Sequence, residues 1–333
     1  MQYQAGGTQP SVVVVVVNWN GASQSRRCLR SLQALDYENV EVCLVDNGST
    51  DGSGVQLASE FSEVNVLALE SNLGYAGGCN AGIEWARESG GEYVWLLNND
   101  TTVDESTLRA LVTRGQELCS AGTTAILAPK ILFAAEPTKI WSAGGYLRWP
   151  WLERHHVGMG EEESKRRMPE QLDWASGCSL FFQTSVASTV GPLDERYFLY
   201  LEDVDWCIRA RRRGIPIWFV PEAQLWHDVS QSMKKVDSRD LRYYVTRNYY
   251  ILAFDHCGPI GRVWAGLRLA VTLLKSTLRS LLFPSYRRDS YYQSQTRGSV
   301  DFVRRRFGKA PYGAEGSVPS ASPQAIERIG EHG

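Results

Sequence analysis

The first 120 residues alternate short apolar runs with amphipathic segments. Residues 12–17 are six consecutive valines, followed directly by the polar triplet Asn18-Trp19-Asn20. A continuous β-branched run of this length predicts a strand that is buried on both faces. The apolar runs at 40–45, 64–69 and 93–97 predict three more strands.

The segments between and after these strands have apolar residues at helical spacing. They predict helices over 23–35, 53–61, 76–88 and 104–118. This alternation predicts an α/β fold with a mostly parallel sheet and helices on both faces. The pattern loosens after about residue 121, where 139–182 holds strand-like pieces and a charged loop at 161–167. Later helices are expected at 202–213, 240–254 and 260–282, with a short apolar strand at 217–220.

Polar side chains follow each of the four early strands. The segments after the strands are Asn18-Trp19-Asn20, Asp46-Asn47-Gly48-Ser49-Thr50-Asp51, Asn72-Leu73-Gly74 and Asn98-Asn99-Asp100. Asp and Asn also form ordinary turns, so one such loop alone indicates little. Because the carboxyl ends of parallel strands share one edge of the sheet, four such loops together predict a ligand site there.

A glycine-rich segment, residues 74–82, follows the third strand and opens a helix. Its glycines let the backbone approach a ligand, and a helix N-terminus favours an anion such as phosphate. The segment does not match the dinucleotide pattern G-x-G-x-x-G, and no phosphate-loop motif G-x-x-x-x-G-K-[ST] occurs in the chain. A nicotinamide-dependent oxidoreductase is disfavoured, because the turn after the first strand is Asn-Trp-Asn-Gly-Ala-Ser.

Several acidic residues are candidates for chemistry. Asp100 follows a strand and suits a hard divalent cation bridged to phosphate oxygens. Glu202, Asp203 and Asp205 crowd a helix start, where acids are favourable for the helix dipole and can also supply a general base of raised pKa. His227 is expected just after the strand at 217–220, where it is either a packed core residue or a ligand.

Composition narrows the partners. The chain of 333 residues has 35 Lys and Arg against 37 Asp and Glu, a formal net charge of −2. A nucleic-acid binder would be basic throughout, so nucleic acid is not expected as a partner. No apolar run approaches the ~20 residues needed to cross a bilayer. The seven cysteines are dispersed and form no Cys-x-x-Cys pair, which favours reduced thiols and a cytoplasmic location.

Taken in order, eight motifs over residues 11–255 resemble the family 2 glycosyltransferases, specifically the rhamnosyltransferase-like branch. The motifs are Val16-Val17-Asn18-Trp19-Asn20, the segments 46–52 and 72–80, Leu97-Asn98-Asn99-Asp100, the segments 191–198 and 202–206, Trp226-His227 and Tyr244-Val245-Thr246-Arg247-Asn248. The resemblance implies an inverting GT-A fold. It also implies transfer of a sugar from a nucleotide-diphosphate donor to a glycan or lipid-linked glycan acceptor.

The resemblance also implies roles for individual residues. Asp203, next to Glu202, matches the catalytic base. Asp100 and His227 match the site of Mg²⁺ or Mn²⁺, although Asn98 replaces the first acid of the Asp-x-Asp motif. The implied donor-binding residues are Asn18, Asn20, Asp46, Asn72, Gly74, Gly77, Asn80, Asn98 and Asn99. The implied acceptor contacts are Trp174, Gly177 and Cys178.

The C-terminal third has a different charge balance. Residues 241–309 hold 13 Lys or Arg and three acids, a net of +10, whereas the rest of the chain sums to −12. We therefore divide the chain into a catalytic domain at 11–255, a basic helical extension at 256–309 and a disordered tail at 310–333. The amphipathic segment 260–282 is expected either to rest on an anionic membrane at the inner face of the cell membrane or to pack on protein, including a second copy.

Two functions from different classes remain open. The first is an active glycosyltransferase with dTDP-rhamnose as the favoured donor, and with UDP-galactofuranose or another UDP-hexose as alternatives. The second is a non-catalytic sugar-nucleotide-binding or assembly subunit of the same fold. The presence of Asp203 and His227 favours the enzyme, while Asn98 leaves room for the second.

Overall fold

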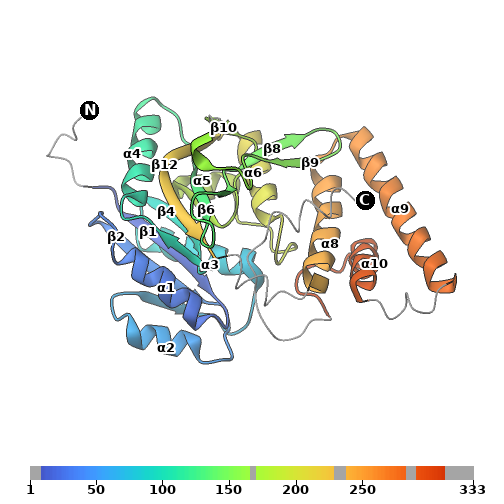
Figure 1. Ribbon diagram of the computed structural model, residues 1–333, viewed down its shortest axis with the longest axis horizontal. Helices are drawn as coiled ribbons and strands as arrows, with labels where there is room; N and C mark the ends of the chain where they lie inside the picture. The colour runs from blue at the N-terminus through green and yellow to red at the C-terminus, as the bar shows by residue number, and fades with distance from the viewer. Residues whose placement is uncertain (1–8, 166–169, 229–237, 283–289, 312–333) are drawn as a thin grey trace.

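The computed structural model describes residues 9–165, 170–228, 238–282 and 290–311. A ten-stranded sheet lies at the centre of the molecule, with helices on both faces (Figure 1). The main path of the sheet runs β10-β12-β6-β11-β4-β1-β2-β3, with β5 paired to β12 and β7 paired to β6. The strands β1 to β4 pair in parallel, as the sequence predicts, and β6 pairs in parallel with β12.

The sheet strands are β1 (Val12–Asn18), β2 (Val40–Asp46), β3 (Asn65–Ala68), β4 (Tyr93–Asn98), β5 (Thr101–Val103), β6 (Ile126–Phe133), β7 (Ile140–Ser142), β10 (Gln171–Leu172), β11 (Ser179–Gln183) and β12 (Ile217–His227). A separate hairpin joins β8 (Gly145–Arg148) to β9 (Glu153–His156). The helices are α1 (Ala22–Leu32), α2 (Ser53–Glu60), α3 (Gly74–Glu88), α4 (Thr107–Ser120), α5 (Thr184–Val190), α6 (Glu202–Arg212), α8 (Ser238–His256), α9 (Pro259–Leu282) and α10 (Ser290–Val303), with a short 3-10 turn at Glu163–Lys165.

The valine run of β1 is buried on both faces, as predicted. Val13, Val15 and Val17 belong to the hydrophobic core on the α3 side, while the alternate valines belong to the core on the α1 and α4 side. Gly82 lets α3 approach the sheet closely, because a Cβ at this position would lie 2.1 Å from Val15 Cγ1. The continuous apolar run thus reflects a strand with core on either side.

One strand prediction needs correction. The strand expected at 217–220 continues to His227, so Trp226 and His227 lie within β12 and not after it. Its pairing with β6 shifts register between Val220 and Gln224, across Pro221. Proline has no N–H for the ladder, and this explains why the sequence suggested an early strand end. The sheet also contains β11, which is antiparallel to both β4 and β6.

One helix begins later than predicted. The helix expected from Asp104 starts at Thr107, because the Asp104 carboxylate accepts a hydrogen bond from the backbone N–H of Ser106 at 3.0 Å. This local bond holds residues 104–106 in a turn ahead of the helix.

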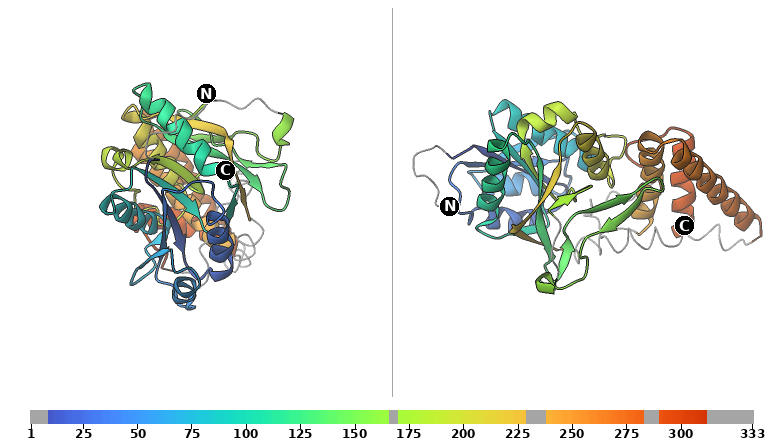
Figure 2. Two further views of the ribbon diagram at one scale, coloured as in Figure 1. Left: turned by 90° about the vertical axis from the view of Figure 1, so that its left-hand side faces the viewer. Right: turned by 90° about the horizontal axis from the view of Figure 1, so that it is seen from above.

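Helices α8, α9 and α10 project from one side of the sheet body (Figure 2). The β8–β9 hairpin extends from the body toward α9 in the same view. No helix within the described ranges is long and apolar enough to cross a membrane. The tail predicted to be disordered lies almost wholly outside the described residues, as do residues 166 and 167 of the charged loop.

Candidate active site

The polar ends of β1, β2 and β4 lie side by side at one edge of the sheet. Asn18 pairs with Asp46 across β1 and β2, and Val17 pairs with Asn98 across β1 and β4. The parallel register therefore brings together residues that are far apart in the sequence, as the strand-end argument expects.

The Asn18 side chain is fully buried and bonds within the protein. Its amide nitrogen lies 3.0 Å from Asp46 Oδ1 and 2.9 Å from Ser53 Oγ, and its oxygen accepts from Ser25 Oγ at 2.7 Å. Asn20 has a left-handed backbone, φ 50°, and its Oδ1 accepts from the backbone N–H of Thr50 at 2.8 Å. Both asparagines thus shape the loop after β2, and their contact with a donor stays a prediction.

The start of α3 is packed against the loop before α6. Gly74 has φ +78°, and a Cβ there would lie 2.3 Å from the Phe198 carbonyl oxygen. Asn72 Oδ1 accepts from Gly74 N at 2.8 Å. A Cβ at Gly77 would meet the Leu73 side chain at 2.6 Å. These contacts fix the glycine-rich turn in place, and the contact of Asn72, Gly74 and Gly77 with a donor stays a prediction.

Asn80 points away from this edge toward the segment before α6. Its amide donates to the Leu193 carbonyl at 2.9 Å and its oxygen accepts from Leu193 N at 2.8 Å. It also contacts Glu195 Oε1 at 3.1 Å. Asn80 therefore joins α3 to that segment, and its predicted donor contact remains untested.

Asn98, Asn99 and Asp100 line one wall of a cavity. Asn98 Oδ1 is buried and has no hydrogen-bond partner within the described residues. Asn99 Nδ2 donates to Ser25 Oγ at 2.9 Å. Asp100 Oδ1 lies 3.1 Å from His227 Nε2, and the His227 ring is completely buried against Trp141.

This wall fits a hard divalent cation in part. Asp100 supplies a carboxylate, Asn98 an unsatisfied oxygen, and neither ring nitrogen of His227 has a hydrogen-bond partner of standard geometry among the described residues. Oxygen ligands and imidazole both suit Mg²⁺ or Mn²⁺. In the part of the chain that the structure describes, no three His, Cys, Asp or Glu side chains cluster to hold a metal. The set is therefore incomplete without further oxygens, such as those of a diphosphate.

Asp203, in the first turn of α6, lines the same cavity. Its Oδ2 accepts from Gly177 N at 2.7 Å and its Oδ1 from Val204 N at 2.8 Å. Burial raises the pKa of Asp203, while these two backbone N–H groups and the charge of Arg154 oppose the rise. A carboxylate of raised pKa is a stronger base than an exposed aspartate.

Glu202 is buried beside it, and its Oε2 has no hydrogen-bond partner within the described residues. Burial, with the neighbouring charge of Asp203, raises the pKa of Glu202 well above its usual range. The two adjacent carboxyl groups thus differ in environment, and the pKa of Glu202 is raised without the backbone N–H bonds to Gly177 and Val204 that oppose the rise at Asp203.

The loop with Ser176, Gly177 and Cys178 also lines the cavity, and its backbone bonds to Asp203 and Asn98. Tyr75 OH donates to the Gly177 carbonyl at 2.6 Å, and Asn98 N donates to the Cys178 carbonyl at 2.9 Å. Trp174 lines the cavity as well, so the three predicted acceptor residues lie together. The cavity and the open space at its mouth together hold about 930 Å³ of volume free of protein atoms.

Arg154 and His156 on β9 are titratable residues that line the cavity, and no sequence motif indicated them. Burial lowers the pKa of Arg154 to about 10, partly offset by Asp203, so the guanidinium stays charged at neutral pH. Burial and the charge of Arg154 lower the pKa of His156 to about 3, so its ring is neutral. Their alternation on one strand was the available signal, within a stretch where the overall pattern is weak.

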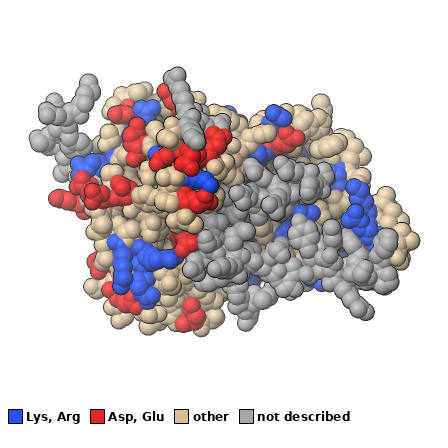
Figure 3. Space-filling model, viewed as in Figure 1, with Lys and Arg blue, Asp and Glu red and all other residues tan. Residues whose placement is uncertain are grey.

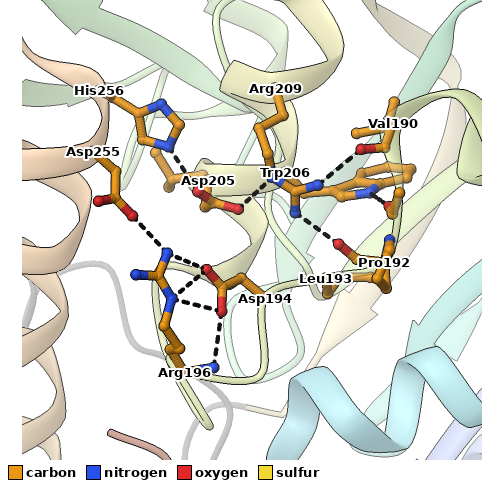
Figure 4. A network of polar contacts seen from close by, with 12 residues as sticks. Val190, Pro192, Leu193, Asp194, Arg196, Asp205, Trp206, Arg209, Asp255 and His256 are labelled. Atoms are coloured by element: carbon orange, nitrogen blue, oxygen red, sulfur yellow. Dashed lines mark hydrogen bonds and ion pairs between the residues drawn. The ribbon is translucent and has the colours of Figure 1, made fainter. Parts of the chain in front are cut away.

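Asp205, the third acid of the α6 motif, has a structural role (Figure 4). Its two oxygens lie 2.6 Å from His256 Nε2 and 2.7 Å from Arg209 Nε. Nearby, Arg196 bridges Asp194 and Asp255, both at 2.6 Å. These contacts tie α6 and the segment before it to α8.

Comparison with known proteins extends these observations. The model of Glycosyl transferase family 2 matches residues 11–181. An N-acetylglucosaminyl-diphospho-decaprenol L-rhamnosyltransferase of Mycobacterium tuberculosis is 28% identical over 265 residues, which cover 74% of this chain and 85% of that protein. The dTDP-rhamnosyl transferase RfbF of Shigella flexneri is 21% identical over 91% of this chain and 99% of its own length.

Among solved structures, GalNAc-T7 with UDP, GalNAc and Mn²⁺ is similar with a TM-score of 0.55 and 18% identity. The match covers 67% of this chain and 44% of that chain, so this chain matches less than half the length of that protein. At this identity the likeness concerns the fold, and it confirms the expected GT-A architecture.

Proposed function

The chain belongs to glycosyl transferase family 2, and from this membership we propose that it is an inverting enzyme that moves rhamnose from a nucleotide-diphosphate donor to a glycan or lipid-linked glycan acceptor. One observation supports this most directly. Asp203, a buried carboxylate of raised pKa, and the Asn98-Asn99-Asp100 wall line the same cavity. A base and a diphosphate site in one cavity suit direct displacement at a sugar carbon bound between them.

The proposed reaction is a single displacement. Asp203 accepts the proton of the acceptor hydroxyl, the hydroxyl oxygen bonds to the anomeric carbon, and the bond from that carbon to the diphosphate oxygen breaks. The nucleoside diphosphate leaves with the bonding electrons, and the anomeric configuration inverts. The charge of Arg154 lowers the pKa of Asp203 against the effect of burial, and burial raises the pKa of Glu202 beside it.

Asp100 and His227 would hold Mg²⁺ or Mn²⁺, with Asn98 Oδ1 as a further oxygen. The bound ion would neutralise the charge that develops on the departing diphosphate. Because the protein offers few ligands, we expect the ion to bind weakly until a diphosphate adds its own oxygens. The predicted residues Asn18, Asn20, Asp46, Asn72 and Asn80 would act around this wall, mostly by shaping its loops.

The donor we favour is dTDP-rhamnose. The Shigella flexneri relative is a dTDP-rhamnosyl transferase, and the Mycobacterium tuberculosis relative is an N-acetylglucosaminyl-diphospho-decaprenol L-rhamnosyltransferase. UDP-galactofuranose or another UDP-hexose is the alternative. A lipid-linked acceptor would place the enzyme at the inner face of the cell membrane, in peripheral contact with it.

A panel of nucleotide sugars tests the donor. In the presence of Mg²⁺, dTDP-rhamnose is expected to raise the unfolding temperature more than UDP-hexoses or dTDP alone, because a ligand that binds only the folded state stabilises it. Transfer is then measured as nucleoside diphosphate released in the presence of acceptor. Stabilisation by a UDP-sugar alone would contradict the rhamnose assignment, and donor binding without any transfer would contradict the catalytic one.

A further inference from the structure

Helix α9 exposes an apolar stripe along its whole length. The exposed residues recur at intervals of one, three or four positions, so they share one side of the helix. They are Ile260, Val263, Trp264, Leu267, Val271, Leu274, Leu278, Leu281 and Leu282, each between 46% and 69% exposed. Contiguous apolar surface of this extent marks a binding surface in soluble proteins.

All charged residues of the same helix are basic. It carries Arg262, Arg268, Lys275 and Arg279 and has no Asp or Glu. Figure 3 shows blue atoms and no red ones at the right-hand end of the molecule, over α9. Three of these cations fall between the apolar stripe and the buried side of the helix, which holds Ala265 and Leu269.

The tip of the β8–β9 hairpin continues this stripe. Trp149 and Trp151 are 41% and 40% exposed, and the Trp151 ring packs edge-on against Trp264 with centroids 5.1 Å apart. A Cβ at Gly261 would lie 2.5 Å from the Pro150 carbonyl oxygen, so the hairpin sits directly on the start of α9. Tryptophan is favoured where an apolar surface meets water at a membrane.

The other end of the hairpin reaches the cavity. Arg154 and His156 on β9 line it together with Asp203. Tyr249 on α8 supports the hairpin, because its hydroxyl donates to the Trp151 carbonyl at 3.5 Å and its ring lies under Arg268. The hairpin therefore joins the exposed stripe to the candidate active site.

We propose that α9 and the tip of the β8–β9 hairpin form one docking face for the surface of an anionic lipid bilayer. The apolar stripe enters the headgroup region and the flanking cations contact lipid phosphates. Two copies of α9 face to face would bring only like charges together, whereas an anionic surface complements them. If the chain acts as proposed above, docking would also turn the cavity toward an acceptor held in that bilayer.

Sedimentation with phosphatidylcholine vesicles, with and without phosphatidylglycerol, tests the docking face without donor or acceptor. The parent is expected to bind the anionic vesicles and to release them at high salt. The double variant Leu267→Glu, Leu274→Glu should lose binding at least tenfold. The matched control Val55→Glu changes an equally apolar, 80% exposed residue on α2 and should bind like the parent.

Charge reversal separates the electrostatic part. Lys275→Glu is expected to weaken binding to anionic vesicles by about fivefold or more, since each cation near such a surface contributes a factor of about that size. Arg30→Glu on α1 should have little effect. Parent protein that stays in the supernatant with both vesicle types, or that forms a dimer broken by the Leu267 and Leu274 changes, would overturn the proposal. Sugar transfer to a soluble acceptor is measured separately, so failure of docking and failure of the proposed reaction are distinguishable.

A second inference concerns the segment that leads into Glu202 and Asp203. Phe198, Tyr200 and Leu201 have φ values of 63°, 68° and 75°, a left-handed conformation that side chains with a Cβ disfavour. Strained backbone of this kind persists only where its surroundings hold it, and it is frequent at functional sites.

Arg247 and Asn248 on α8 donate hydrogen bonds to backbone carbonyl groups of this segment. The Asn248 amide nitrogen lies 2.8 Å from the Leu199 carbonyl oxygen and 2.7 Å from that of Tyr200. Arg247 donates to the Tyr197 carbonyl at 2.8 Å, and its Nε donates to Asn248 Oδ1 at 3.0 Å. Both side chains are completely buried.

We infer that Arg247 and Asn248 are positioning residues for Asp203. They fix the carbonyl groups of the strained segment, and this segment sets the start of α6 and so the direction of the Asp203 carboxylate. The motif that contains them otherwise has no role in the proposed reaction. Neither residue lines the cavity, so the effect acts through the backbone.

Replacement of Asn248 by Asp tests this inference, because Asp keeps the shape but loses the N–H donors. We expect kcat to fall at least tenfold, the donor KM to change little, and the acidic limb of the pH–rate profile to move. Ser276→Ala is the control, since it removes a buried hydrogen bond between α9 and α10 far from the segment. An Asn248→Asp variant with lower thermal stability but the parent's kcat and pH profile would refute the positioning role.

Discussion

Replacement of Asp203 by Asn separates its proposed chemistry from its structural contacts. The carboxylate accepts one hydrogen bond on each oxygen, from Gly177 N and Val204 N. An asparagine oxygen can accept one of these bonds, so one backbone N–H loses its partner, at a cost of about 1–3 kcal/mol. Removal of a buried charge offsets part of this cost, and we expect the fold and donor binding to persist.

The effect on transfer should be much larger. A general base contributes ~10²–10⁴-fold, which corresponds to roughly 3–5 kcal/mol of activation free energy. The assay is the initial rate of nucleoside diphosphate release at saturating donor and acceptor. The parent's rate should fall as the pH drops through the raised pKa of Asp203, because the protonated carboxyl cannot accept the proton, and the variant should lack this limb. A variant rate within tenfold of the parent, in a folded protein, would refute the assignment.

Three further changes have defined outcomes. Asp100→Ala should leave the unfolding temperature nearly unchanged without ligand and abolish the Mg²⁺-dependent part of donor binding, measured by calorimetry; equal binding with and without Mg²⁺ in the parent would contradict this. Asp205→Asn should lower the free energy of unfolding by about 3–5 kcal/mol near pH 7, because His256 and Arg209 lose a buried partner. Burial alone would raise the pKa of Asp205, but His256 and Arg209 lower it overall. The difference in unfolding free energy between parent and variant should therefore shrink as the pH falls below the unfolded pKa of about 3.9. Urea titrations at several pH values would show this. Glu202→Gln should stabilise the protein at pH 8. Because the pKa of Glu202 is raised in the folded state, the parent loses stability as the pH rises from the unfolded pKa of about 4.3 toward the folded pKa, and Gln removes this loss. An unchanged or lower stability of the variant at pH 8 would argue against a raised pKa of Glu202.

The first half of the fold could be predicted because its strands are short, mainly apolar runs. The six valines of β1 and the apolar run of β4 are buried on both faces, and β2 is buried over Cys43–Val45, so the signal needs no tertiary information. The second half lacks this signal. β11 lies antiparallel between β4 and β6, and β12 crosses Pro221, so their places depend on partners distant in the sequence.

The candidate site divides in the same way. Asp100 and Asp203 could be found from motifs, and both line one cavity in the structure. Arg154 could not, because it belongs to a short hairpin whose position is set by α8 and α9. Asn80 shows the reverse case, since its motif suggested a ligand contact while its amide is occupied by the Leu193 backbone.

The pairing of β5 with β12 has a consequence for the order of folding. This pairing sets His227 opposite Thr101 and so brings it to Asp100, a residue from the other half of the chain. During synthesis the β1–β4 layer emerges long before β12, and contacts between distant segments form late because their loops are costly to close. The Asp100–His227 contact therefore forms only when the sheet is complete. Its appearance in a refolding experiment, followed by quenching of Trp141 beside His227, would time the last step of assembly.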